Sequence, residues 1–129
     1  MSLIIEVKTI PQSDHRYPTL GDYVGHEKLR FIQVSDIGHA KYEFLIAIHE
    51  LIEQALCLER GIAEEEITKF DIAFEKSGKE GEPGDDPLAP YHREHVYATA
   101  VEISLCKELG LDPNAYDRYL NEYLKKHGI

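Results

Sequence analysis

The sequence predicts an α+β fold that is mainly α, with a small N-terminal antiparallel β-hairpin or meander packed on about four helices. Residues 3–9 and 28–34 are rich in β-branched and apolar residues, as β-strands are. From about residue 39 onward, apolar residues recur at helical spacing, and Gly and Pro separate the helical stretches. A chain of 129 residues fits one domain, residues 1–129, with one hydrophobic core.

The two predicted strands are joined by a connection that turns repeatedly. Pro11, Pro18, Gly21 and Gly25 lie between them. Residues 19–24 are expected to pair as a short third strand. A sheet this small is not stable alone, so we expect helices to cover it.

Four helices are expected, at about residues 39–60, 63–75, 90–109 and 113–126. Ser35-Asp36 supplies an N-cap pair before the first helix, and Gly38 delays its start. Asp112-Pro113 supplies an N-cap and a proline at the first position of the last helix. Residues 77–90 are rich in Gly, Pro and acidic side chains, which predicts a loop.

The composition excludes several classes of partner. The chain has 24 acidic and 14 basic residues and a formal charge of −10, which disfavours nucleic-acid binding. No apolar run approaches the roughly 18 residues of a membrane span, and no basic segment marks a signal peptide. Cys57 and Cys106 are therefore expected to be reduced thiols in a cytoplasmic protein. A protein partner or a homodimer remains open.

One motif on the first helix indicates chemistry. His49 and Glu53 are four residues apart, so their side chains share one face of the helix with Leu45, Ile52 and Leu56. Burying a charge costs several kcal/mol unless the charge is paired or bound to a metal. A hydrogen-bonded structural pair and a metal site both meet this requirement.

The segment Ile48-His49-Glu50-Leu51-Ile52-Glu53 resembles the His-Glu-x-x-His helix of the zincin metallopeptidases, with Glu in place of the second His. The resemblance implies that His49 and Glu53 are metal ligands and that Glu50 is the general base. It also implies zinc as the cofactor and hydrolysis of a peptide or amide bond as the reaction.

A third ligand is expected from the start of the third helix. His95 shares an inward face with Ala98 and Glu102, whereas His92 lies nearer the helix end and is expected to be more exposed. Two histidines and one carboxylate suit Zn²⁺ first, and also Fe²⁺ or Mn²⁺. Glu102 could orient a ligand histidine. Cys57, one turn beyond Glu53, is expected to be a small core residue, and a fourth ligand is the alternative.

The sequence leaves two other functions open. Most of the chain, including residues 81–86 and 89–95, resembles small phage and prophage proteins that have no established activity, which implies a non-enzymatic accessory protein with a structural His-Glu cluster. Glu50-x-x-Glu53 resembles half of the metal motif of all-α, Mg²⁺-dependent nucleotide pyrophosphatases. Neither Glu102 nor Glu108 is followed three residues later by the Asp of the other half, which disfavours this family. The acidic loop could form a rim or lid beside the site.

Overall fold

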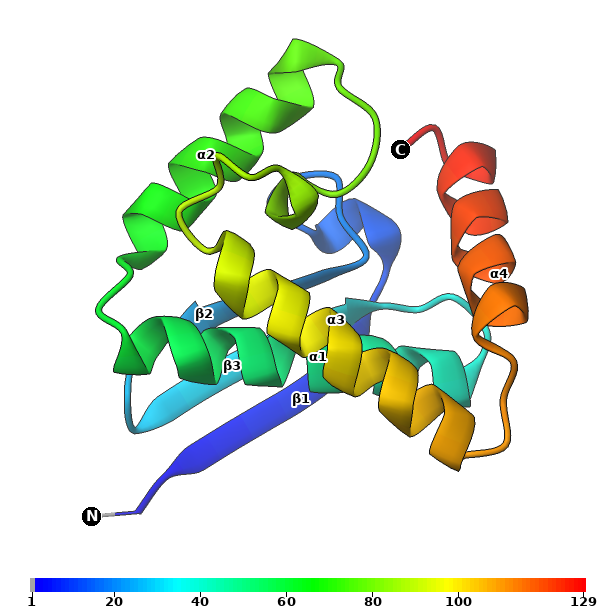
Figure 1. The fold of residues 1–129 in the computed structure, drawn as a ribbon, viewed down its shortest axis with the longest axis horizontal. Coiled ribbons are helices and arrows are strands. Elements are labelled where there is room, and N and C mark those ends of the chain that lie inside the picture. Colours follow the sequence, from blue (N-terminus) through cyan, green and yellow to red (C-terminus); the bar gives the residue numbers. More distant parts are fainter. Residues whose placement is uncertain (1) are drawn as a thin grey trace.

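The computed structural model describes residues 2–129 and shows a three-stranded sheet followed by four helices (Figure 1). The predicted α+β, mainly α class is confirmed. The strands are β1 (Ile4–Ile10), β2 (Gly21–Gly25) and β3 (Leu29–Ser35). The helices are α1 (Ala40–Glu59), α2 (Glu64–Ser77), α3 (His92–Glu108) and α4 (Pro113–Lys126). Short 3-10 turns, η1 (Gln12–Asp14) and η2 (Pro83–Asp85), lie in the two long connections.

The sheet has the strand order β1-β3-β2. Strands β2 and β3 form an antiparallel hairpin, with Tyr23 opposite Ile32. The departure from the prediction is β1, which runs parallel to β3 rather than antiparallel. The connection at residues 11–20 is long enough to carry the chain across the end of β3, so β1 and β2 flank β3 on opposite sides. The Ser35 hydroxyl holds this connection in place by donating to Gln12 Oε1 at 2.6 Å.

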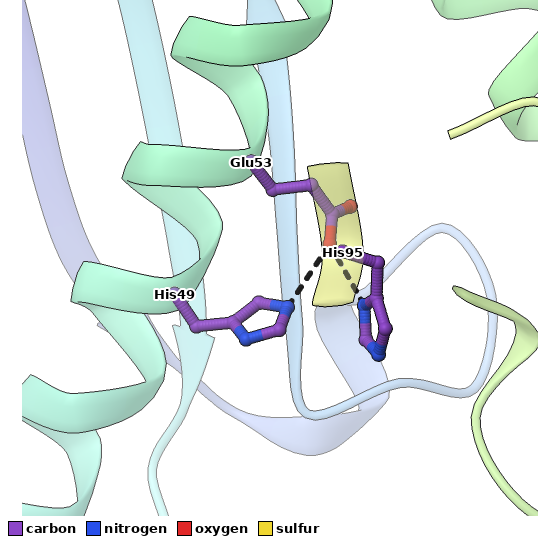
Figure 2. A group of neighbouring side chains, drawn as sticks. All are labelled: His49, Glu53 and His95. Atoms are coloured by element: carbon purple, nitrogen blue, oxygen red, sulfur yellow. Dashed lines mark hydrogen bonds and ion pairs between the residues drawn. The ribbon is translucent and has the colours of Figure 1, made fainter. Parts of the chain in front are cut away.

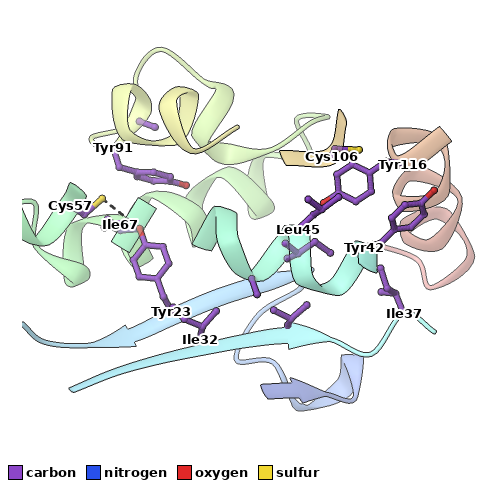
Figure 3. Close-up of a cluster of buried hydrophobic side chains, with 14 residues drawn as sticks. Tyr23, Ile32, Ile37, Tyr42, Leu45, Cys57, Ile67, Tyr91, Cys106 and Tyr116 are labelled. Carbon is purple, nitrogen blue, oxygen red and sulfur yellow. Dashed lines mark hydrogen bonds between the residues drawn. The ribbon is translucent and has the colours of Figure 1, made fainter. Parts of the chain in front are cut away.

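Helix α1 is the centre of the core, with the sheet on one side and α3 on the other (Figures 1 and 3). Tyr23, Ile32 and Val34 are buried on the sheet face that meets α1. They share this face because Ile32 and Val34 are two residues apart on β3, and Tyr23 lies directly opposite Ile32. Leu45 of α1 is fully buried. The tyrosine-rich α4 packs inward through Tyr116, which is buried in the same core cluster.

Local sequence signals account for most helix ends. The Asp112 carboxylate accepts a hydrogen bond from the Asn114 N–H at 3.0 Å, which confirms the predicted N-cap of α4. Helix α2 ends at Gly78, whose φ of 72° provides the left-handed cap. Helix α1 is capped by His39 rather than by Ser35 or Asp36, because its ring nitrogen accepts a hydrogen bond from the Tyr42 N–H.

The structure also bears on the cysteines and on membrane-spanning segments. Both cysteines are free and buried, as expected for reduced thiols. Across residues 2–129, none of the helices combines the length and apolar character needed to cross a membrane.

Candidate metal centre

Three predicted site residues converge between α1 and α3. His49 and Glu53 project from consecutive turns of α1, and His95 projects from the first turn of α3 (Figure 2). His49 Nε2 lies 3.0 Å from Glu53 Oε2, and His95 Nδ1 lies 2.9 Å from the same oxygen. All three side chains are buried. The packing of α1 against α3 thus brings together Glu53 and His95, which lie 42 residues apart in the sequence with α2 between them.

The second nitrogen of His49 contacts Glu102. His49 Nδ1 lies 2.8 Å from Glu102 Oε1, across the α1–α3 interface. The Tyr116 hydroxyl of α4 donates to the other oxygen of Glu102. A carboxylate bound to the outer nitrogen fixes the tautomer and ring orientation of a ligand histidine. Glu102 therefore contacts the outer nitrogen of His49, and its role in orienting a ligand histidine stays a prediction.

The second nitrogen of His95 contacts the acidic loop that precedes α3. His95 Nε2 lies 3.0 Å from Asp85 Oδ1 and 3.5 Å from Glu82 Oε2. Gly84, between these two residues, is buried against the imidazole ring. A Cβ atom built on Gly84 would lie only 2.3 Å from His95 Cγ, so the close approach requires glycine here. The loop is thus part of the wall around the site.

Hydrogen bonds between the carboxylates and the imidazoles favour the charged form of both kinds of group. Burial alone lowers the pKa of His49, but its hydrogen bonds to Glu102 and Glu53 raise the pKa to about 11. Burial likewise opposes charge on His95, but Glu53 and Glu82 raise the pKa of that imidazole to about 10. Burial raises the pKa of Glu53, but the two histidines outweigh it and lower this pKa below its usual value. Without a cation, the two imidazoles carry the positive charge that the acids require.

The buried His49–Glu53–His95 group could hold a metal ion. One donor atom from each residue lies within 4.8 Å of the others. Ligand atoms of one tetrahedral zinc ion stand about 3.3 Å apart, because each lies about 2.0–2.1 Å from the ion. The two histidine–Glu53 separations, 2.9 and 3.0 Å, are a few tenths of an ångström shorter than this, and the two histidine nitrogens lie within 4.8 Å of each other. A dication would then take over the role of the two imidazole protons.

Glu50 lies next to the group on α1 but faces the sheet. A Cβ atom built on Gly21 of β2 would lie 2.9 Å from Glu50 Oε1, so the carboxylate rests directly against the strand. Burial, followed by the negative charge of Glu53, raises the pKa of Glu50 well above its usual value. Glu50 is thus a half-buried carboxyl group, held against β2, that binds its proton more tightly than an exposed glutamate does.

Two other predicted residues lie outside the ligand group. Cys57 is a core residue whose Sγ lies 3.6 Å from the Tyr23 hydroxyl, and burial raises the pKa of its thiol to about 12. A thiol that stays protonated is a poor metal ligand. His92 is half-buried rather than exposed, because its Nδ1 lies 2.9 Å from the Gly84 carbonyl oxygen.

The sequence predicted that the acidic loop lies beside the site, but it did not predict the contacts that four residues make there. Tyr23 donates a hydrogen bond of 3.0 Å to Glu53 Oε1, and Tyr116 donates to Glu102. Glu82 and Asp85 contact His95 from the loop. The alternation along β2 could have indicated that Tyr23 faces α1, but no local pattern connects Tyr116 with Glu102.

A second buried carboxylate lies beside this site. Asp71 of α2 accepts hydrogen bonds from Tyr17, at 3.1 Å, and from Tyr91. Burial raises the pKa of Asp71 to about 6, because the two neutral hydroxyl donors only partly oppose it.

Comparison with known proteins gives no further guide to the site: the chain matches no family model, no curated protein and no solved structure.

Proposed function

We propose that this protein binds a divalent metal ion through His49, Glu53 and His95 and uses it to hydrolyse a peptide or amide bond. The observation that carries the proposal is the convergence of His49 Nε2 and His95 Nδ1 on one oxygen of Glu53, at 3.0 and 2.9 Å. The resemblance of the α1 motif to the zincin helix supports the choice of reaction.

The donor set favours zinc, with iron or manganese as alternatives. Two imidazole nitrogens and one carboxylate oxygen suit these metals better than Mg²⁺, which prefers oxygen ligands and water. Three protein ligands leave a position for water or substrate. A zinc ion at such a site supplies Lewis acidity and lowers the pKa of a bound water toward neutrality.

The remaining residues have separable roles in this proposal. Glu50 would be the general base by the resemblance to the zincin helix, and in this role its carboxylate would be ionised and turned from Gly21 toward the ligand group. Glu102 keeps His49 oriented through the 2.8 Å contact with Nδ1. Asp85 does the same for His95 through Nε2.

A second candidate function is a non-enzymatic accessory protein in which the cluster is purely structural. The observation that favours it is that both nitrogens of His49 and both nitrogens of His95 already face carboxylates. Buried polar groups with complete partners need no metal.

Metal content separates the two candidates. Protein with a C-terminal tag, purified without chelator and without metal-affinity resin, is measured by mass spectrometry of metals, before and after incubation with Zn²⁺ and dialysis. We expect near-stoichiometric zinc in the wild type and in His26→Ala, which changes an exposed histidine of the β2–β3 turn. We expect loss of zinc in His49→Ala and His95→Ala. A wild type that holds no metal would leave the structural candidate standing.

Catalysis needs a separate test. Glu50→Gln removes the proposed base but leaves all three ligands, so we expect bound zinc at the wild-type level and loss of hydrolysis of a mixed peptide library. A zinc-loaded wild type that cleaves nothing in the library, or a Glu50→Gln variant that cleaves as well as the wild type, would contradict the proposed role of Glu50.

A further inference from the structure

Strand β1 is an open edge of the sheet. It pairs with β3 on one side only, because the strand order is β1-β3-β2 (Figure 1). All of its residues except Ile10 are exposed, and Ile4, Ile5 and Val7 are 57%, 40% and 48% exposed. The strand has seven residues and no proline. A mostly apolar edge strand of this length is a site where another strand pairs, because its two charged side chains project from the face of the sheet and leave the backbone edge open.

The backbone groups of β1 show which residues are free to pair. Ile4 donates its N–H to Lys28, and the Ile10 carbonyl accepts from Asp36, so these even-numbered residues point their backbone groups toward β3. Alternate residues of a strand point their N–H and C=O groups to opposite edges. Ile5, Val7 and Thr9 therefore present theirs to the open edge.

The charges of β1 are self-complementary about Val7. In an antiparallel pair of two copies centred on Val7, residue 6 of one copy lies opposite residue 8 of the other. Glu6 would then face Lys8 of the second copy, and this contact would occur twice. A centre at residue 6 or at residue 8 would instead place two glutamates or two lysines opposite each other, which destabilises a sheet. The Val7 centre also places Val7 opposite Val7, and Ile5 opposite Thr9, so that the backbone groups on the open edges of the two copies can form hydrogen bonds with each other.

We propose that two copies of this chain associate through β1, antiparallel and centred on Val7, to form a continuous six-stranded sheet. The contact is two-fold symmetric, so it closes on itself and does not propagate into a fibre. The solvent-accessible surface of one chain is 7876 Å², whereas a compact monomer of this mass exposes about 7,000 Å². The larger surface is consistent with a chain that buries part of it against a second copy. The proposed contact lies outside the histidine site and does not depend on metal binding.

The test is the molar mass of chelator-treated protein with a C-terminal tag, measured by sedimentation velocity from micromolar to near-millimolar concentration. We expect the mass to rise with concentration toward twice the 14.8 kDa of one chain. Glu6→Lys places lysine opposite lysine twice, so we expect the dissociation constant to rise about tenfold or more. The double variant with Glu6→Lys and Lys8→Glu restores opposite charges, and we expect it to return to within about threefold of the wild type.

Two further variants separate this contact from general effects. Val7→Pro removes only an N–H that faces the open edge, a position where an edge strand tolerates proline, so we expect loss of the dimer with the fold retained by circular dichroism. Glu65→Lys makes the same charge change on the exposed surface of α2 and should leave the dimer unchanged. A wild type that stays monomeric at the highest concentration would overturn the proposal. So would a dimer that Glu6→Lys and Val7→Pro leave intact.

Discussion

Glu53 and Asp71 are two carboxylates in the same core with opposite protonation behaviour. Their side chains are almost equally buried, at 5% and 7% exposure. Glu53 contacts two imidazoles and one tyrosine hydroxyl, whereas Asp71 contacts two tyrosine hydroxyls. The pKa of Glu53 is lowered, but that of Asp71 is raised to about 6.

The difference shows that the charge of the partners, rather than burial or the presence of hydrogen bonds, decides how a buried acid behaves. Imidazolium partners offset the cost of desolvating Glu53, so this carboxylate stays ionised and attracts cations. Neutral hydroxyls do not offset that cost for Asp71. Glu53 therefore belongs to a group that could hold a cation, whereas Asp71 makes a structural contact with Tyr17 and Tyr91.

The largest expected effect is on stability when each carboxylate is neutralised. Glu53→Gln leaves two buried imidazoles without their shared acid, so we expect the free energy of unfolding to fall by about 3–5 kcal/mol. Asp71→Asn keeps a hydrogen-bond acceptor for the tyrosines, and we expect a loss of about 1–3 kcal/mol. Urea unfolding at pH 7 in the presence of chelator measures both. A loss for Asp71→Asn as large as that for Glu53→Gln would contradict the distinction drawn from partner charge.

The second prediction concerns pH. Because the pKa of Asp71 is about 6 in the folded protein and about 4 in an unfolded chain, the folded state binds this proton more tightly. The contribution of Asp71 is therefore stabilising below about pH 4 and is lost as the pH rises through about 6, by up to about 3 kcal/mol.

Urea unfolding measures the free energy of unfolding of wild type and Asp71→Asn between about pH 4 and pH 7, a range that covers the pKa of Asp71 in the unfolded and in the folded state. We expect the variant to lose stability less steeply than the wild type as the pH rises. Glu53 should behave in the opposite sense, with a contribution that is lost as the pH falls through its lowered pKa. Parallel profiles for wild type and Asp71→Asn would rule out the raised pKa.

The third prediction uses the close contact between Gly84 and His95. Gly84→Ala introduces a Cβ atom 2.3 Å from the imidazole Cγ, so we expect His95 to move away from Glu53. The overpacking should cost about 1–3 kcal/mol of stability, and zinc binding should weaken. Gly21→Ala is the matched control, because its Cβ meets Glu50, which is not a proposed ligand, at 2.8 Å. Equal zinc affinity in Gly84→Ala and wild type, by calorimetric titration, would argue against His95 as a ligand.

The smallest expected effect comes from removing a hydroxyl group next to the site. Tyr116→Phe keeps the buried ring but removes the donor to Glu102, so we expect a loss of about 1 kcal/mol of stability and several-fold weaker zinc binding. Tyr119→Phe removes a hydroxyl that donates to the Ile37 carbonyl, away from the site. We expect it to cost similar stability and to leave zinc affinity unchanged. If both variants bind zinc alike, Glu102 does not orient His49 in the way proposed.

Much of the local structure could be read from the sequence. The helical spacing predicted the bounds of α2 to within a few residues, and the Asp112-Pro113 cap predicted the start of α4, because these signals act over one or two turns. The shared face of His49 and Glu53 follows from the same periodicity. The inward face of His95 was predicted in the same way, and the structure buries it.

The direction of β1 could not be read in this way. Whether a strand joins parallel or antiparallel depends on the path of the connection at residues 11–20, and that path is held by contacts with Ser35, at the far end of β3. The pairing of Tyr116 with Glu102 similarly depends on how α4 packs against α3. Neither contact leaves a periodic signal in the sequence.

The sequence by itself determined the fold class, the positions of the helices and which face of α1 carries an imidazole and a carboxylate, since each is a short-range property of the chain. Only the tertiary structure decided that His95 meets Glu53, that Glu102 and Asp85 contact the outer histidine nitrogens, and that Asp71 has tyrosine hydroxyls as its hydrogen-bond partners. The physical reason is that hydrogen bonds and charge interactions act over a few ångströms in space. The residues involved are brought within that range only when α1, α3 and the acidic loop pack together.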